Sequence, residues 1–487
     1  MGYSDNKNPL SIEALLQRII ALEQHNSRLE KKLEEKDKII TDQNMLIKNL
    51  QDELAKYKKN SSNSSKPPSS DIVKPPKQKK EEGKRKIGGQ PGHQRHERTP
   101  FTPEEIDKTI SYSLDACPDC NGSLIPTDIA PRVLQQIEII EKPVEVTEHL
   151  GLAYLCEKCG KIHHAPLPPE VERAGLAGPL LTALIGYMKG CCHASYSTIA
   201  AFLEDFAHIK VSTGFLVKIV MKAAAALEQP YNELLNFIPQ EPVVNIDETG
   251  HKLNKEKFWT WCFRAKLYVL FKIDKSRGSK VIIDILGKEF DGVIGCDYFN
   301  AYRKYMKDFN TAVQFCIAHL IRDVKFLVSL YDKPSALYGE RLLDEIRILF
   351  KIIHSQAEMT PDAFHKALET QRNAIITIAT LDVPNHKAAR NMANRFIKHG
   401  DSYFRFITIP GIDPTNNIAE QAIRFVVIDR LITHGTRSES GNRWCERIWS
   451  VMATCAIQKH SPFQFLLSAV KAFFSGIQSP SLLTNHL

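Results

Sequence analysis

Two short apolar segments of the sequence each end in an aspartate. "VVNID" ends in Asp247 and "GVIGCD" ends in Asp297, and both segments have the composition of buried β-strands. Side chains alternate along a strand, so Asp247 shares a face with Asn245, while its neighbour Glu248 points the other way and is set aside. If the two strands are adjacent, their aspartates repel each other unless a divalent cation lies between them. Oxygen ligands favour Mg²⁺ or Mn²⁺ over zinc.

A third carboxylate is expected on a helix further along the chain. Asp413 or Thr415 can cap a helix that carries Glu420 and, one turn later on the same face, Arg424. With Glu420 facing the strand ends, the three acids would form a two-metal site. One metal would activate the attacking water or 3′-hydroxyl, and the other would stabilise the leaving oxygen of a phosphodiester displacement. Each acid alone is more typical of a turn or a solvated surface, so only the three together indicate a site.

Several basic side chains are candidates for contacts with phosphate groups. Arg424 could neutralise a phosphate beside the acids, and His319 with Arg322 could approach the scissile phosphate. A structural role for His319 is at least equally compatible with the sequence. Three further arginines near the C-terminus fit either DNA contacts or surface ion pairs, and the sequence favours neither: Arg437, Arg443 and Arg447.

The elements around the acids follow the order of a ribonuclease-H-like fold. Three strands are expected first, and "VVNID" is expected to end at the turn-like Thr249 and Gly250. A helix, a strand, a helical turn, a fifth strand "AVQFCIAHL" and a helix follow. We therefore expect an α/β catalytic domain over 241–430 with an all-helical insertion at about 334–400, and a helical C-terminal segment over 431–487.

Two cysteine pairs indicate a small zinc-binding module over 101–170. "CPDC" and "CEKC" each separate two cysteines by two residues, a spacing typical of thiolate knuckles around one tetrahedral ion. His163 or His164 could replace a thiolate. A closed site of this kind stabilises a fold and leaves no open position for catalysis. The expected ligands are Cys117, Cys120, Cys156 and Cys159.

The N-terminal hundred residues combine a heptad repeat with a basic segment. Residues 11–58 place mainly Ile at position a and Leu at position d, which favours a parallel two-stranded coiled coil and hence a homodimer. A lone amphipathic helix is the alternative. Residues 56–98 carry 13 Lys and Arg against 4 Asp and Glu, whereas the whole chain has a net charge of +8. The linker over 59–100 is therefore expected to be a disordered basic arm, either a plain spacer or a contact for nucleic acid.

Residues 171–240 read as helical. A turn near Ser212 and Thr213 separates two helices over about 196–222, which fit either a helix-turn-helix that reads DNA or an ordinary helical hairpin. Residues 176–188 form the longest nearly apolar run and are too short to cross a bilayer. With no apolar export signal and an odd number of cysteines, 11, the sequence indicates a cytoplasmic protein without membrane association.

The chain resembles the transposases of the insertion-sequence-66 family over nearly its whole length. The resemblance rests on motifs across the chain: "NSSNSSKPPSSD", "GGQPGH", the cysteine pairs, "IDET", "CDYFNAY", "DPTNNIAEQAIR" and "HGTRSESGNRWCERIWSVMATC". It implies a DDE transposase with Asp247, Asp297 and Glu420 as catalytic acids and a helical insertion before the glutamate. It also implies Mg²⁺-dependent cleavage at transposon ends followed by strand transfer.

The sequence thus predicts a multidomain α+β DNA transposase. Its expected partners are double-stranded DNA at transposon ends and target, a second copy of the chain, and candidate accessory proteins of the same element. Two other functions fit the residues: a metal-dependent DNA nuclease of the same fold that does not join strands, and a non-catalytic zinc and coiled-coil DNA-binding regulator.

Overall fold

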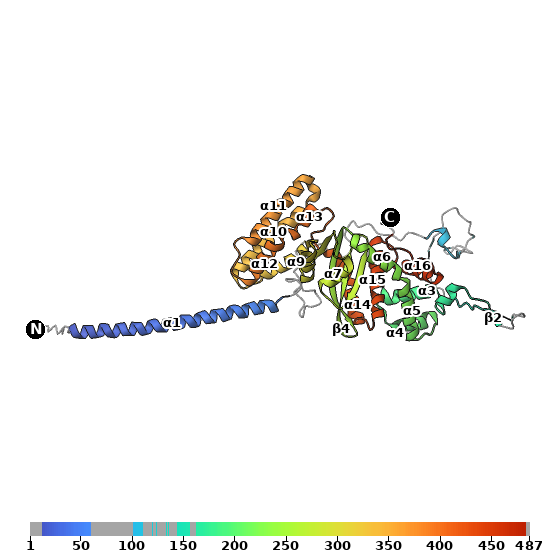
Figure 1. The fold of residues 1–487 in the computed structure, drawn as a ribbon, viewed down its shortest axis with the longest axis horizontal. Coiled ribbons are helices and arrows are strands. Elements are labelled where there is room, and N and C mark those ends of the chain that lie inside the picture. Colours follow the sequence, from blue (N-terminus) through green and yellow to red (C-terminus); the bar gives the residue numbers. More distant parts are fainter. Residues whose placement is uncertain are drawn as a thin grey trace. The chain divides into compact units, whose positions relative to one another are not determined.

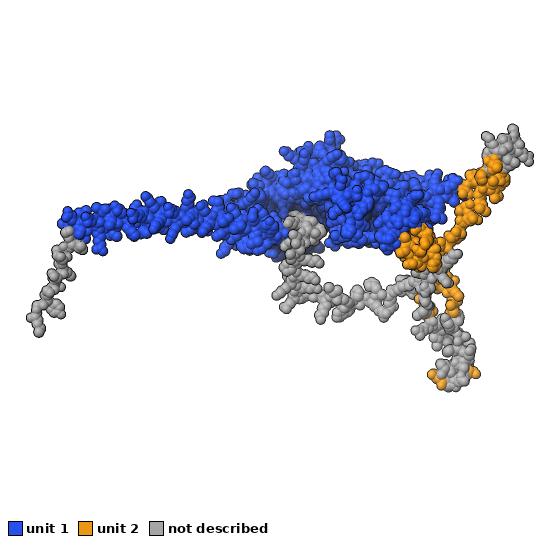
Figure 2. All heavy atoms as spheres, turned by 90° about the horizontal axis from the view of Figure 1, so that it is seen from below, with its two compact units in different colours: residues 1–75, 168–199, 212–487 blue, residues 76–167, 200–211 orange. Residues whose placement is uncertain are grey.

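The computed structural model describes residues 12–59, 101–110, 144–155 and 162–483, together with residues 119, 123, 133 and 135. The chain divides into two compact units (Figure 2). Unit 1 comprises Met1–Pro75, Pro168–Ile199 and Ser212–Leu487, and unit 2 comprises Pro76–Leu167 and Ala200–Val211.

A five-stranded mixed sheet forms the centre of unit 1. Its strand order is β5-β4-β3-β6-β7; β3, β4 and β5 are antiparallel, whereas β6 and β7 run parallel to β3. These are the order and directions of a ribonuclease-H-like sheet, so the expected mixed α/β core is confirmed. The strands are β3 (Val243–Leu253), β4 (Glu256–Arg264), β5 (Val269–Asp274), β6 (Val293–Cys296) and β7 (Ala312–Phe315).

Strand β3 is longer than the sequence indicated. The prediction of a turn at Thr249 and Gly250 was wrong, because β4 pairs with β3 continuously from Asn245 to Leu253. The turn falls instead at Asn254 and Lys255, whose φ angles of 47° and 73° suit a tight hairpin. Pairing with the parallel strand β6, by contrast, stops at Asn245. The centre of β3 therefore runs on beyond the end of its parallel neighbour.

Helices cover both faces of the sheet (Figure 1). α14 (Asn417–Thr433) and α15 (Glu439–Gln458) pack on one face, and α7 (Ser279–Leu286) and α8 (Asn300–Phe309) lie on the other. The helical turn expected after β6 is the full helix α8. The fifth strand is shorter than predicted, because α9 (Ile317–Val328) already begins two residues after Phe315.

Side chains of α15 bond to the outer edge of the sheet. The amides of Val269, Phe271 and Ile273 on the edge strand β5 donate to side-chain oxygens on α15, at 3.1, 2.9 and 2.6 Å. The acceptors are spaced by four residues and so lie on one helix face: Thr454, Ser450 and Glu446. An edge strand otherwise leaves these donors unpaired, so α15 closes this edge.

The helical stretch expected before Glu420 contains three helices, coloured orange in Figure 1. They are α10 (Lys333–His354), α11 (Pro361–Thr380) and α12 (Lys387–His399), followed by the short α13 (Arg405–Thr408). α10 packs on α9, α11 on α10, and α12 on α11. We call residues 333–408 the insertion.

Several helices precede the sheet: α2 (Pro169–Ala174), α3 (Pro179–Gly190), α4 (Tyr196–Ala207), α5 (Thr213–Ala226) and α6 (Glu228–Phe237). Ser212 caps α5 as expected, accepting a hydrogen bond from the amide of Phe215 at 3.2 Å. α5 packs against α3, α15 and α16 (Pro462–Ser475). Its apolar contacts fit the helical-hairpin alternative, and DNA reading by this helix stays a prediction.

α1 (Ile12–Tyr57) is one helix over the predicted heptads, and its Ile and Leu residues at a and d are exposed. Their pairing with a second chain stays a prediction. In unit 2, β1 (Ala153–Leu155) pairs with β2 (Ile162–His164). Cys117, Cys120, Cys156 and Cys159 lie outside the described residues. Within the part of the chain that the structure describes, no helix is long and apolar enough to cross a membrane.

Candidate active site

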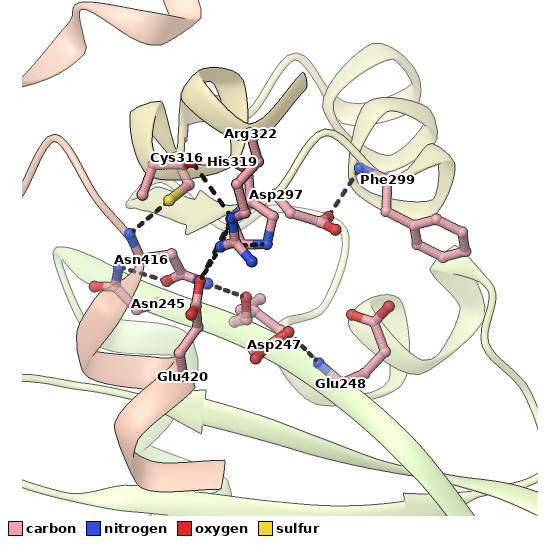
Figure 3. Close-up of polar contacts among 12 residues, drawn as sticks. Asn245, Asp247, Glu248, Asp297, Phe299, Cys316, His319, Arg322, Asn416 and Glu420 are labelled. Carbon is pink, nitrogen blue, oxygen red and sulfur yellow. Dashed lines mark hydrogen bonds and ion pairs between the residues drawn. The ribbon is translucent and has the colours of Figure 1, made fainter. Parts of the chain in front are cut away.

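The register of the parallel strands brings Asp247 and Asp297 together. Asn245 on β3 is the partner of Gly295 on β6, and each aspartate follows two residues later in its own strand direction. Neighbouring strands are separated by about 4.8 Å, so the two carboxylates leave the same end of the sheet side by side (Figure 3). The observed register thus places these two residues next to each other, as the sequence predicted.

Glu420 reaches the same end of the sheet from the first turn of α14. The predicted caps Asp413 and Thr415 were wrong, because the residue before α14 is Asn416, and its side chain bonds to the sheet instead of capping the helix. Asn416 Oδ1 accepts from Asn245 Nδ2 at 2.8 Å, and Asn416 Nδ2 donates to the carbonyl of Ile246 at 2.8 Å. The start of α14 is therefore fixed directly to β3, one residue before Asp247.

The close packing of this asparagine pair depends on a glycine. A Cβ on Gly295 would collide with the side-chain amide of Asn245. The backbone amide of Asn416 also donates to the thiol of Cys316, at 3.1 Å, at the end of β7. β3, β6 and β7 thus all lie against the start of α14 beside the acids.

Asp247 and Asp297 are crowded by other acids. Burial, followed by the charges of Glu248, Asp297 and Glu420, holds the pKa of Asp247 well above its usual range. Burial also raises the pKa of Asp297, and this is opposed by the amide of Phe299 and by Arg277 and Arg395. In the described part of the chain, each aspartate accepts only a backbone amide, from Glu248 at 2.9 Å and from Phe299 at 2.8 Å.

Glu248 lies on the opposite face of β3, as alternation predicts, yet its charge is felt by Asp247. On that face its side chain is only 2% exposed. There it accepts from Arg277 Nη2 at 2.8 Å and from the hydroxyl of Tyr302 at 2.5 Å. Burial and the charge of Asp297 raise the pKa of Glu248 to about 7. Asp297 lies past the end of β6 and so approaches acids on both faces; strand alternation alone could not reveal this.

His319 and Arg322 contact Glu420. Both lie in the first turns of α9, with His319 Nδ1 at 3.4 Å and Arg322 Nη2 at 3.1 Å from Glu420 Oε1. Burial and the charge of Arg322 lower the pKa of His319 to about 4, so its ring is neutral at neutral pH. The role of either residue as a phosphate contact stays a prediction.

One group of described residues has the spacing of a metal site. The ligand atoms of Cys316, His319 and Glu420 lie within 4.8 Å of one another. Burial raises the pKa of the Cys316 thiol to about 11, so it is protonated at neutral pH. The guanidinium of Arg322 already supplies a positive charge between His319 and Glu420. We therefore interpret Cys316 and His319 as residues that surround Glu420, and not as ligands of a separate metal site.

The remaining arginines fall into two groups. Arg443 Nη1 pairs with Glu446 at 2.7 Å, and Arg447 Nη2 pairs with Glu228 at 2.7 Å, so both act as ion-pair partners within the fold. Arg424 and Arg437 are exposed. DNA contacts by these two arginines stay a prediction.

The sheet topology defines a protein of the ribonuclease-H-like class. Residues 174–443, more than half of the chain, match the model of the family described as "Transposase IS66 family". The chain belongs to this transposase family. Residues 6–99 match a second model, a family of unknown function designated DUF6444.

Two individual proteins are also similar. "Uncharacterized protein y4qI" of Sinorhizobium fredii is 22% identical over 427 residues, covering 80% of this chain and 77% of that protein. The HTLV-2 integrase catalytic core domain, solved in complex with magnesium in a dimeric form, is 16% identical and covers 31% of this chain and 97% of that chain. Its TM-score is 0.13, so the fold assignment rests on strand order and direction alone.

Proposed function

We propose that this transposase-family chain cuts DNA at the ends of a mobile element and joins those ends to target DNA, using Asp247, Asp297 and Glu420. The observation that carries the proposal is the meeting of three acids from distant segments at one end of the sheet. Folding places like charges together at a cost, and such crowding is typical of functional sites.

The residues present fit a bound divalent cation. Asp247 and Asp297 carry hard oxygen ligands and, among the described residues, have no cationic side chain bonded to them. Their neighbours Glu248 and Glu420 are each paired with an arginine. Mg²⁺ or Mn²⁺ prefers such ligands and would stabilise the charge that develops on the attacking and leaving oxygens of a phosphodiester.

Each acid has a distinct part in this proposal. Asp247 and Asp297 would bind the cation from two adjacent strands, whose fixed register sets their separation. Glu420 would complete the site from α14, with Arg322 and His319 orienting its carboxylate. We assign Arg424, exposed one turn beyond Glu420, to a neighbouring DNA phosphate.

Other parts of the chain would serve assembly and DNA binding. We propose that α1 pairs two copies of the chain, that the basic arm over 59–100 binds DNA phosphates, and that Cys117, Cys120, Cys156 and Cys159 bind one structural zinc ion. Accessory proteins of the same element remain candidate partners.

Strand joining separates a transposase from a nuclease of the same fold. The purified chain is incubated with Mg²⁺, pre-cleaved DNA carrying the terminal sequences of its own element, and a target plasmid. We expect covalently joined products that depend on the 3′-hydroxyl, and none when the ends carry a 3′-dideoxy nucleotide. Cleavage of uncut ends without any joined product would favour the nuclease, and neither activity would favour the DNA-binding regulator.

A further inference from the structure

Arginines from separate segments stack on the two aromatic residues of the turn that follows β6. Tyr298 and Phe299 come directly after Asp297, and each ring stacks on a guanidinium from a different part of unit 1. Arg277, in the loop before α7, lies 4.1 Å from the ring centre of Phe299, and Arg395, on α12 of the insertion, lies 3.9 Å from that of Tyr298. Arg303 of α8 also lies 4.6 Å from the ring centre of Tyr298, so arginines from three segments contact the two residues after Asp297.

Arg395 is an unusual residue to find in this position. It is only 8% exposed, although a long cationic side chain is normally solvated. Arg395 Nη1 pairs with Asp323 on α9 at 2.7 Å, and Arg395 Nε donates to the hydroxyl of Tyr403. Among the described residues its other amino group, Nη2, is buried without a hydrogen-bond partner. Tying helices together does not require a buried guanidinium with unused donors.

The contacts of Tyr298 show what this arginine holds. The ring of Tyr298 packs edge-on against Phe315 of β7 at 4.9 Å and stacks with Tyr403 at 6.4 Å between ring centres. Arg395 and Tyr403 of the insertion thus both contact the residue next to Asp297. Any shift of α12 would therefore move Tyr298. Because Tyr298 is bonded directly to Asp297, this shift would also move the carboxylate of Asp297.

We propose that Arg395 is a positioning residue through which the insertion holds the Asp297 carboxylate in place for its cation. The inference rests on the proposed role of Asp297. Outer residues that orient a metal ligand commonly change metal affinity about 10- to 100-fold when they are removed. The insertion then contributes to the site without any of its side chains contacting the substrate.

Variants that keep the charge distinguish positioning from simple electrostatics. Loss of the Arg395 charge alone has two opposing effects, because Arg395 repels a cation but also favours the ionised form of Asp297. Arg395→Lys keeps the charge but loses the planar stack on Tyr298. Weaker cation binding in Arg395→Lys therefore indicates positioning, whereas unchanged binding in that variant indicates an effect of charge.

The test measures Mn²⁺ binding to the full DNA-free chain by titration calorimetry, with thermal unfolding as a check on folding. We expect Arg395→Met to weaken Mn²⁺ binding about tenfold or more, and Arg395→Lys to weaken it to a smaller extent. Arg372→Met is the control, since Arg372 is likewise an ion-paired arginine of the insertion, bonded to Glu369 and Asp401, and among the described residues it has no hydrogen bond or ring contact with the turn. It should bind Mn²⁺ like the unchanged chain.

Tyr298→Leu removes the stack between Arg395 and Tyr298 without removing a buried charge, and it replaces Arg395→Met as the test if that variant does not fold. We expect Tyr298→Leu to weaken Mn²⁺ binding to a similar extent. Unchanged or tighter binding in folded Arg395→Met, or in Tyr298→Leu in its place, would overturn the inference. Asp297→Asn is measured alongside: if it binds Mn²⁺ normally, the proposed site itself fails. If it loses Mn²⁺ while the Arg395 and Tyr298 variants do not, only the positioning role fails.

Discussion

At the scale of single residues, the asparagine pair beneath the acids determines where Glu420 lies. Asn416 is 1% exposed, and three of its hydrogen bonds link α14 to the sheet region, through the side chain of Asn245, the carbonyl of Ile246 and the thiol of Cys316. The first two use its side chain. These contacts place the start of α14 relative to β3 without any contribution from the acids themselves.

Replacing Asn416 by alanine should therefore affect both stability and activity. The Asn416→Ala chain leaves a buried carbonyl and a buried amide unpaired, and we expect its free energy of unfolding to fall by about 1–3 kcal/mol. The start of α14 is then no longer fixed to β3, so the position of Glu420 becomes less well defined. We therefore expect cleavage to fall by more than the decrease in the fraction of folded protein accounts for. Urea unfolding and cleavage assays measure the two effects.

Asn417→Ala is the control, because Asn417 is the exposed next residue. An Asn416→Ala chain with the stability and activity of this control would contradict the role of the pair.

The acids themselves could be found from the sequence, but their environment could not. Asp247 and Asp297 follow apolar runs, and this pattern carries over directly to the observed register. Alternation correctly turned Glu248 to the other face, but its interaction with Asp297 does not follow from alternation, because β6 ends before this point. Its partners Arg277 and Tyr302 come from separate segments, and no local pattern links them to it.

At the scale of elements, α15 closes the sheet with buried polar side chains. Glu446 is the most costly of these, since its side chain is fully buried beside Arg443 and Lys272. Burial raises its pKa to about 7 despite these cations. The carboxyl group therefore holds its proton more tightly in the folded chain than in the unfolded chain.

This shift predicts a pH dependence of stability. Between about pH 4.5 and pH 7 the unfolded chain releases this proton while the folded chain retains it, so stability falls as the pH rises, by up to about 3 kcal/mol above pH 7. Glu446→Gln cannot titrate, and its free energy of unfolding should decline less between pH 5 and pH 8. Denaturant unfolding at both pH values measures the difference.

Glu439→Gln on the same helix is the matched control, because Glu439 is 69% exposed. The prediction is contradicted if Glu446→Gln and Glu439→Gln lose stability equally over this range.

Element types were more predictable than element ends. Short apolar and aromatic-rich runs marked the strands, but the end of β3 depends on how far β4 extends beside it, which is a tertiary property. The cap of α14 was assigned to Asp413 or Thr415 by local preference, whereas Asn416 follows its partners on β3. The attachment of α15 to β5 joins segments about 180 residues apart, and periodicity does not report on such distances.

At the scale of the whole molecule, the insertion contacts both α1 and the acids' end of the sheet. Asp52 of α1 pairs with His386 at 3.0 Å, and Ala55 is buried. These residues occupy heptad positions other than a and d, so the apolar stripe of α1 remains available for a second chain. The sequence indicated a helical insertion, but not that Arg395 within it stacks on the residue next to Asp297.

The most direct test of the account is Mg²⁺-dependent cleavage by Asp297→Asn, measured on DNA carrying the ends of the chain's own element. We expect cleavage to fall roughly a thousandfold or more while DNA binding is retained, because the substitution removes a metal-binding charge with almost no change in volume. Asp291→Asn is the control, since Asp291 is exposed shortly before the start of the same strand. Cleavage by Asp297→Asn at the level of Asp291→Asn would contradict the proposed site.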